Sequence, residues 1–178
     1  MDIRRRLLLS GGGALAVMAT LGQWRVKAAQ PGDDAAATTG AASGPPEHFA
    51  VVHSDAQWRR LLTPAQYEVL RNAGTEPPFT SPLNDEHRAG IFACAGCATN
   101  LFASTTKFES GTGWPSFYAP LPHAVAEHRD RSFGMVRTEV HCHRCGGHLG
   151  HVFDDGPKPT GLRYCMNGIA MTFKPGAA

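Results

Sequence analysis

The sequence predicts a mainly β domain in which antiparallel strands follow short N-terminal helices and a four-cysteine zinc site staples distant segments together. Three observations predict this fold. Short segments rich in aromatic and β-branched residues recur from Ile91 onward, which is typical of strands. Their connections are too short to hold crossover helices, which favours antiparallel pairing. Two C-x-x-C pairs have the spacing of ligands to one zinc ion.

Residues 1–28 have the pattern of an export signal. Three arginines, at positions 4–6, precede an apolar run at residues 7–21, and residues 26–28 offer small side chains for cleavage. The arginines resemble the twin-arginine export signature. A membrane span is the alternative, but glycines at 11–13 interrupt the run. We therefore expect export, to the periplasm, with no stable membrane insertion after cleavage.

Residues 29–47 are rich in Ala, Gly, Thr, Ser and Pro and predict a flexible linker, so the folded domain should span residues 48–178. Residues 1–28 hold five of the 17 basic and one of the 15 acidic residues, which leaves 12 against 14. A mildly acidic chain without a basic run argues against nucleic acid as a partner. We expect a monomer.

Two short helices are predicted at the start of the domain. Residues 54–57 and 63–66 both carry the capping-box pattern, and Pro64 suits the first position of a helix. Gly74 is the expected left-handed residue that ends the second helix. The strands that follow are predicted at residues 91–93, 107–109, 117–118, 135–140, 149–153, 162–167 and 169–173.

The four paired cysteines, Cys94 with Cys97 and Cys142 with Cys145, predict one structural zinc ion. Gly146 follows the second pair, where a metal-binding turn often needs positive φ. The 44 residues between the pairs exceed ordinary zinc-ribbon spacing, so the ion should join two distant hairpins. Two disulfides or a redox dithiol are the alternatives. Three histidines remain conceivable substitute ligands: His141, His143 and His148.

Cys165 is left without a pair and is the candidate reactive thiol. In a strand, Arg163, Cys165 and Asn167 share one face, while Tyr164 and Met166 face the other layer. A nearby guanidinium favours the thiolate, which is the nucleophilic form. A buried, inert cysteine is the alternative.

Two other clusters bear on the choice between these alternatives. Residues 110–117 place Trp114 in a glycine-flanked loop, and residues 146–157 bring His148 and His151 next to the second cysteine pair. A tryptophan in a short strand is usually a core residue and a histidine pair is usually structural. Only their convergence on Cys165 would make an active site.

The stretch from residue 58 to residue 173 resembles the B-type methionine sulfoxide reductases, which act on the R epimer of the sulfoxide. Besides both cysteine pairs, the matching motifs are GTEPPF, GTGWPSF, CGGHLGHVFDDGP and PTGLRYCMN. The resemblance implies two antiparallel sheets with short N-terminal helices. It also implies that Cys165 attacks the sulfoxide sulfur, while His151, with His148, protonates the oxygen.

The same resemblance implies a pocket for the substrate. The methyl group on the sulfoxide sulfur would lie against Trp114, with Phe117 as a further substrate-binding residue. Arg163 and Asn167 would hold the polar parts of the pocket, and Asn167 is also a candidate catalytic residue. The substrates would be oxidised proteins that carry methionine sulfoxide, so the protein would serve in repair.

Some members of that family place a resolving cysteine at the position of Thr112. The resemblance therefore implies a one-cysteine cycle, in which an external thioredoxin-like donor regenerates Cys165 from a sulfenic acid. Two other functions stay open. A zinc-stapled binding module could dock proteins through Trp114 and Phe117 without catalysis, and a disulfide oxidoreductase would require a metal-free dithiol.

Overall fold

The computed structural model describes residues 48–177. The predicted export signal and linker, residues 1–28 and 29–47, lie outside the described residues. Within residues 48–177, none of the helices has the length and apolar character needed to cross a membrane.

Two short helices, α1 (Asp55–Leu61) and α2 (Pro64–Asn72), open the domain, and both begin with the expected capping box. The left-handed residue that ends α2 is Ala73, with φ 53°, and not Gly74 as the sequence predicts. The chain reverses directly after Asn72, so the left-handed conformation falls on a residue with a Cβ atom, at a cost of about 1–2 kcal/mol.

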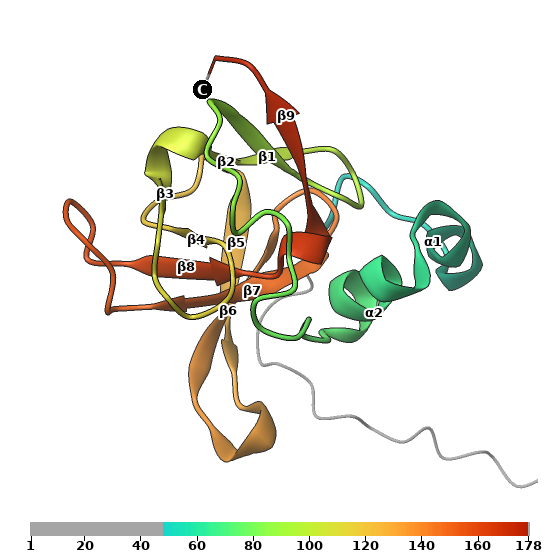
Figure 1. The fold of residues 1–178 in the computed structure, drawn as a ribbon. Coiled ribbons are helices and arrows are strands. Elements are labelled where there is room, and N and C mark those ends of the chain that lie inside the picture. The colour runs from blue at the N-terminus through green and yellow to red at the C-terminus, as the bar shows by residue number, and fades with distance from the viewer. Residues whose placement is uncertain (1–47, 178) are drawn as a thin grey trace, which may run out of the picture. The chain divides into compact units, whose positions relative to one another are not determined.

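The strands form two antiparallel sheets, as expected (Figure 1). The three-stranded sheet has the order β2-β1-β9, from β2 (Asn100–Ala103), β1 (Gly90–Cys94) and β9 (Met171–Pro175). The six-stranded sheet has the order β3-β4-β8-β7-β6-β5. Its strands are β3 (Lys107–Phe108), β4 (Ser116–Phe117), β8 (Arg163–Met166), β7 (His148–Phe153), β6 (Arg137–Cys142) and β5 (Val125–Asp130). Single 3-10 turns lie at η1 (Ser104–Thr106), η2 (Ser132–Gly134) and η3 (Gly168–Ala170).

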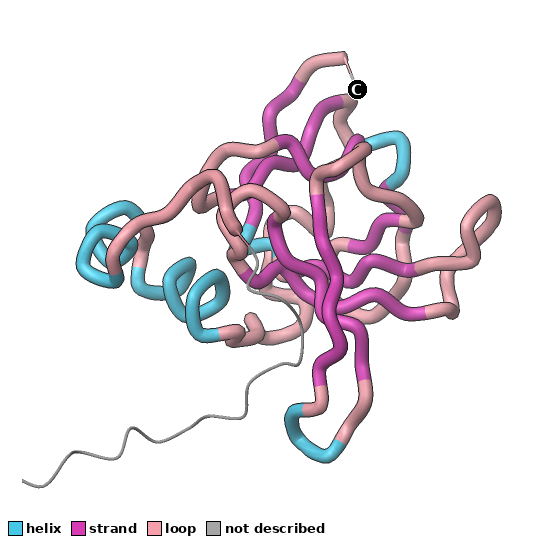
Figure 2. Tube along the Cα trace, turned by 180° about the vertical axis from the view of Figure 1, so that it is seen from behind, coloured by secondary structure: helices cyan, strands magenta, loops and turns pink. Residues whose placement is uncertain are grey.

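Two strands, β2 and β5, are absent from the sequence-based expectation. The six residues of β5 are mostly polar and none is buried, because β5 is an edge strand that pairs only with β6. Alternation of apolar and polar residues is weak in such a strand. The β5–β6 hairpin projects away from the rest of the molecule, with η2 at its tip, in both views (Figures 1 and 2). This turn also explains why β6 begins two residues later than predicted.

Aromatic side chains fill the space between the two sheets. Phe102 of the three-stranded sheet stacks on Phe117 of the six-stranded sheet, with ring centroids 4.3 Å apart. Phe92 packs edge-on against the same Phe117 ring at 4.9 Å. All three side chains are fully buried. This packing turns one face of the six-stranded sheet inward and leaves the other face for the candidate site.

Candidate active site and metal centre

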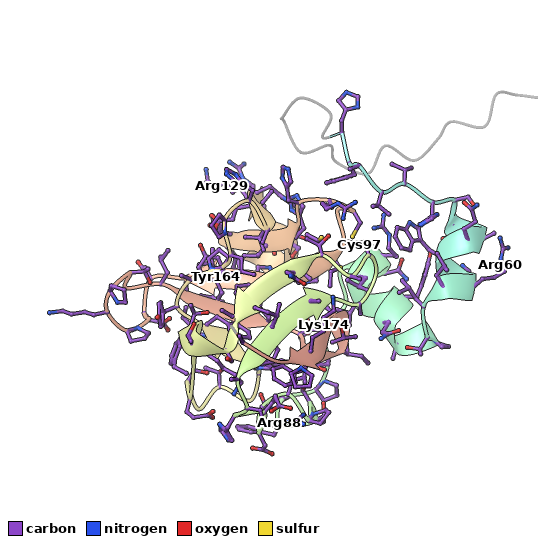
Figure 3. All side chains as sticks on the ribbon, turned by 90° about the horizontal axis from the view of Figure 1, so that it is seen from above. Arg60, Arg88, Cys97, Arg129, Tyr164 and Lys174 are labelled. Carbon is purple, nitrogen blue, oxygen red and sulfur yellow. The ribbon has the colours of Figure 1, made fainter. Side chains whose placement is uncertain are left out.

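The four paired cysteines meet at one point, where the end of β1 approaches the end of β6. The Sγ atoms of Cys94 and Cys145 are 3.7 Å apart, those of Cys97 and Cys142 are 3.5 Å apart, and all four lie within 4.8 Å of one another. Four sulfurs at about 2.3 Å from one zinc ion have this separation, whereas a disulfide needs about 2.05 Å. The five cysteines are all free. Figure 3 shows Cys97 on the side of the sheets that faces the helices.

The two cysteine turns share one backbone geometry. The N–H of Ala98 donates to the carbonyl of Cys94 at 2.8 Å, and the N–H of Gly146 donates to that of Cys142 at 2.9 Å. Ala98 has φ 57° and Gly146 has φ 66°, so both turns need a left-handed residue after the second cysteine. This confirms the expectation for Gly146 and shows that Ala98 adopts the same conformation despite its Cβ atom. The Phe49 ring fills the place of a Cβ at Gly146.

The electrostatics of this cluster favour a bound cation. Three of the sulfurs belong to buried residues, and only Cys97 is partly exposed. Hydrogen bonds from the other thiols, Cys142 first, lower the pKa of Cys97, while the same interactions raise the pKa of Cys94. The sulfurs therefore share protons and cannot all ionise by themselves, because four thiolates at this spacing repel one another. A divalent cation removes that repulsion, so the donor set fits a metal ion with four thiolate ligands.

Cys165 lies in β8, in the middle of the six-stranded sheet. Its direct neighbours across the ladder are Ser116 of β4 and His151 of β7. The burial of β8 alternates as predicted: Tyr164 and Met166 are buried in the core, and Arg163 and Cys165 are only partly buried. Directly opposed residues of antiparallel strands have Cβ atoms about 4.5–5.5 Å apart, so Cys165 and His151 share a face within reach of each other.

Burial favours the thiol form of Cys165. Burial raises its pKa, and this effect outweighs the lowering by the Thr112 hydroxyl, 3.8 Å from Sγ, and by the Arg163 guanidinium. Arg163 does lower the pKa of Cys165, as the sequence predicts, but the sequence did not reveal the larger, opposite effect of burial. Asp155 binds that guanidinium through two hydrogen bonds of 2.8 and 2.9 Å, and its own charge opposes ionisation of Cys165.

His151 is held from the side away from Cys165. Its Nε2 lies 2.9 Å from Oδ2 of Asp130, and the same oxygen accepts a hydrogen bond of 2.6 Å from Arg137. Burial lowers the pKa of His151, while the hydrogen bond with Asp130 raises it. The carboxylate therefore orients the ring and partly restores its ability to hold a proton.

His148 is the second histidine at the site, and its ring centroid is 5.5 Å from that of His151. Its side chain is only 5% exposed, and Nδ1 lies 2.6 Å from Oε1 of Glu139. Glu139 also bonds His128 at 2.7 Å. Within residues 48–177, Nε2 of His148 has no hydrogen-bond partner, so this buried nitrogen can serve a bound ligand.

Trp114 follows a glycine-rich turn that returns the chain to the same face. Its Nε1–H donates to the carbonyl of Glu76 at 3.0 Å, which fixes the plane of the half-buried indole ring. Two residues earlier, Thr112 contacts Cys165 through its hydroxyl. The structure thus brings Trp114, Cys165 and the two histidines to one region of the sheet.

Glu76 is a buried residue of the site that sequence reasoning missed. Its carboxylate accepts hydrogen bonds from the backbone N–H groups of Gly168 and Ile169, directly after β8. Its own N–H donates to Oδ1 of Asn167 at 3.0 Å, and its carbonyl accepts the Trp114 bond. Burial raises the pKa of Glu76, and the two N–H donors oppose this. One residue therefore ties the Trp114 loop to the end of the Cys165 strand.

Two of the candidate site residues, Phe117 for substrate binding and Asn167 for catalysis, have other contacts in the structure. Phe117 lies in the core, on the face of the sheet opposite to Cys165, because it neighbours Tyr164 in the ladder. We therefore correct its assignment as a substrate-binding residue. The amide of Asn167 is held by backbone groups at both ends, since its Nδ2 donates to the carbonyl of Leu149 at 3.1 Å while Oδ1 accepts from the N–H of Glu76. Asn167 thus positions the site by joining the backbone of Glu76 to that of Leu149.

The fold and this arrangement define a class of protein. A mainly β domain carries one thiol beside two carboxylate-bound histidines, and its other four thiols form a separate metal-binding cluster. That is the arrangement of a cysteine-dependent enzyme whose reactive thiol is distinct from the cysteines that could hold a metal ion.

Comparison with known proteins gives the family. Residues 62–175 match the SelR domain. A peptide methionine sulfoxide reductase MsrB of Agrobacterium fabrum is 59% identical over 123 residues, which cover 68% of this chain and 91% of that protein. The MsrB of Leifsonia xyli is 57% identical over 129 residues (71% and 93%), and that of Bradyrhizobium diazoefficiens is 56% identical over 126 residues (70% and 91%). The chain belongs to the MsrB family of peptide methionine sulfoxide reductases, which are oxidoreductases.

Proposed function

We propose that this protein reduces the R epimer of methionine sulfoxide, mainly within oxidised proteins, and that Cys165 carries the reaction. The observation that supports this most directly is the pairing of Cys165 with His151 across β7 and β8. A nucleophile and a proton donor on neighbouring strands of one rigid sheet are held in place before the substrate binds.

The reaction begins when the thiolate of Cys165 attacks the sulfoxide sulfur and the oxygen takes up a proton from His151 or His148. The attack forms a bond between Sγ of Cys165 and the substrate sulfur. The hydroxyl group then moves from that sulfur to Sγ, so that the substrate S–O bond and the S–S bond both break and an S–O bond on Cys165 forms. The substrate sulfur gains two electrons and leaves as methionine, while Cys165 becomes a sulfenic acid. Hydroxide is a poor leaving group, so proton donation should contribute about 10²–10⁴-fold.

The choice of epimer follows from fixing three groups at once. The indole face of Trp114 offers an apolar surface for the methyl group, and it is held by the hydrogen bond to Glu76. The free Nε2 of His148 and the ring of His151 offer the polar side. With sulfur facing Cys165, the opposite epimer would direct its methyl group toward the histidines.

Regeneration requires a thiol from outside the chain. The Thr112 hydroxyl, 3.8 Å from Sγ of Cys165, stands where some family members place a resolving cysteine, and the other four cysteines lie in one cluster. A thioredoxin-like donor would attack the sulfenic acid of Cys165, release water and form a mixed disulfide. A second thiol of the donor would then free Cys165.

The metal held by the cysteine cluster is proposed to be one structural zinc ion, ligated by Cys94, Cys97, Cys142 and Cys145. The separation of the sulfurs and their all-thiolate character support zinc. We also propose that residues 1–28 direct export to the periplasm by the twin-arginine route and that the mature protein is a monomer. The basis of the export proposal is the arginine-led apolar segment of the sequence.

The test is turnover of each sulfoxide epimer of a blocked methionine derivative, with dithiothreitol as the reductant. We expect reduction of the R epimer, and a Cys165→Ser variant that keeps its metal and its fold but loses turnover. Activity on the S epimer alone would refute the proposal. Full retention of fold and metal without any turnover by the unaltered protein would favour a binding module instead.

A further inference from the structure

Phe79 combines two properties that rarely occur together in a bulky residue. Its side chain is 73% exposed, and its backbone has φ 63°, in the left-handed region. An aromatic residue is a clear outlier there, because its Cβ crowds the backbone. Core packing does not explain this conformation, since the ring is in solvent. Unfavourable backbone geometry that packing does not require often marks a functional position.

The backbone holds Phe79 against the loop that carries the candidate substrate pocket. The N–H of Phe79 donates to the carbonyl of Gly113 at 2.7 Å. A Cβ atom at Gly113 would lie 3.0 Å from Cδ2 of the Phe79 ring, so the ring lies directly beside this glycine. Trp114 follows Gly113, and Thr112 precedes it and contacts Cys165. Phe79 is thus at the outer edge of the loop that surrounds the reactive thiol.

The residues before Phe79 extend this apolar surface. Pro77 and Pro78 are also exposed, so residues 77–79 present an uncharged apolar run to solvent, which we name the Pro77–Phe79 ledge. The segment between α2 and β1 that includes this ledge passes across the six-stranded sheet near β4 and β8 (Figure 1). Apolar surface that adjoins a site and is not needed by the core is a common feature of interaction surfaces.

We propose that the Pro77–Phe79 ledge docks an apolar side chain that lies next to the oxidised methionine in an extended protein substrate. This inference rests on the proposed function and deepens it by naming the substrate class. The ledge borders the loop whose Thr112 contacts Cys165, so its occupant is a residue close in sequence to that methionine. Residues of an extended chain are spaced about 3.3 Å apart, so positions close to the methionine can reach a surface that borders the Thr112–Trp114 loop. The absence of charge on the ledge selects apolar flanks over acidic or basic ones.

The test compares two substrates that share the same reacting group. One is a short peptide with a single methionine-R-sulfoxide between leucine residues, and the other is the blocked methionine-R-sulfoxide. Dithiothreitol is the reductant, so that no protein donor is involved. The variants are Phe79→Asn, in which asparagine tolerates positive φ, Phe79→Tyr, which keeps the ring, and Leu61→Asn on α1, a control whose side chain is 60% exposed.

For Phe79→Asn we expect the ratio of kcat/KM for the peptide to that for the blocked amino acid to fall about tenfold, as loss of one aromatic contact implies. Its Tm should not fall, because asparagine relieves the backbone strain. Phe79→Tyr and Leu61→Asn should keep the ratio of the unaltered protein.

An equal loss for both substrates in Phe79→Asn would overturn the inference, since the ledge would then only shape the Trp114 loop. The same ratio is also measured with a thioredoxin-like protein as the reductant. A fall in the ratio that appears only with this protein would overturn the inference as well, because the ledge would then serve the donor. An unchanged ratio of the two kcat/KM values in Phe79→Asn would also overturn the inference. Failure of the unaltered protein to reduce the blocked R epimer would instead refute the proposed function, and the inference with it.

Discussion

His151 and Cys165 are directly opposed in the β7–β8 ladder, and Asp130 holds the histidine from its other side. The relationship links two consecutive strands, β7 and β8, which are joined by the loop at residues 154–162. Because both residues lie on central strands, their separation depends on sheet pairing and not on the conformation of a loop. The sheet therefore fixes the position of the proton donor His151 relative to the nucleophile Cys165, and the first prediction tests this pair.

Replacing His151 by Gln should lower kcat/KM for the R-sulfoxide by about 10²–10⁴-fold, because it removes a proton donor beside Cys165. Metal content and Tm should change little, since the ring is only partly buried. The matched control is His123→Asn, which changes an exposed histidine with φ 57° to a residue that tolerates that conformation. Steady-state kinetics with dithiothreitol measure the effect, and a loss below threefold would contradict the assigned role.

The reactivity of Cys165 should increase with pH beyond the ordinary cysteine range, because burial raises its pKa above the reference value of 9.0. Asp155→Asn removes a nearby negative charge and frees the Arg163 guanidinium, so both changes lower the pKa of Cys165. Its alkylation profile should shift to lower pH. Asp154→Asn, in the adjacent exposed residue, is the control.

This measurement uses the rate of iodoacetamide labelling of Cys165 in the metal-loaded protein, followed by peptide mass analysis between pH 6 and 11. Labelling of the unaltered protein with a midpoint well below pH 9 would show that Arg163, and not burial, controls the thiol. An equal shift in both aspartate variants would point to general surface charge.

Thr112→Cys should convert the one-cysteine cycle into one with an internal disulfide. The Thr112 hydroxyl lies 3.8 Å from Sγ of Cys165, so a thiol there can reach the sulfenic acid after a small rotation. After one turnover without reductant, peptide mapping should find Cys165 joined to the introduced thiol. Thr105→Cys, an exposed position on η1, is the control and should form no such bond. A Thr112→Cys protein that still shows a lasting sulfenic acid would contradict this geometry.

Ala98→Gly should raise the free energy of unfolding of the metal-loaded protein by about 1 kcal/mol, because Ala98 has φ 57° and glycine adopts this region freely. Gly146→Ala should have the opposite effect, since its Cβ would collide with the Phe49 ring. Denaturant unfolding measures both. Removal of the metal by a chelator should lower stability by more than either substitution. A change of the same sign in the free energy of unfolding for both variants would contradict the prediction, because the two turns would then not share a preference for glycine.

Much of this fold and site could be predicted because it depends on local chemistry. The capping boxes at Ser54 and Thr63 formed as expected, since each involves residues only three apart. The spacing of the cysteines correctly predicted one cluster. The alternation of side chains along β8 correctly predicted that Cys165 faces away from the core.

The remainder depends on long-range pairing that no local pattern records. The carboxylate of Glu76 bonds backbone groups more than 90 residues away, so nothing in its surroundings in the sequence marked it. Phe117 was misplaced because β4 has only two residues, and the ladder with Tyr164 decides which one faces the core. Burial of Cys165, which governs its pKa, likewise follows from packing and not from its neighbours in the sequence.

The most direct measurement of the central claim is the mass of the intact protein after one equivalent of a blocked methionine sulfoxide and excess dimedone, which traps sulfenic acids. With the R epimer, we expect one dimedone adduct per chain, located by peptide mapping at Cys165, and retention of the metal. With the S epimer, we expect none. An adduct on any cluster cysteine, or none on Cys165 with the R epimer, would contradict the account.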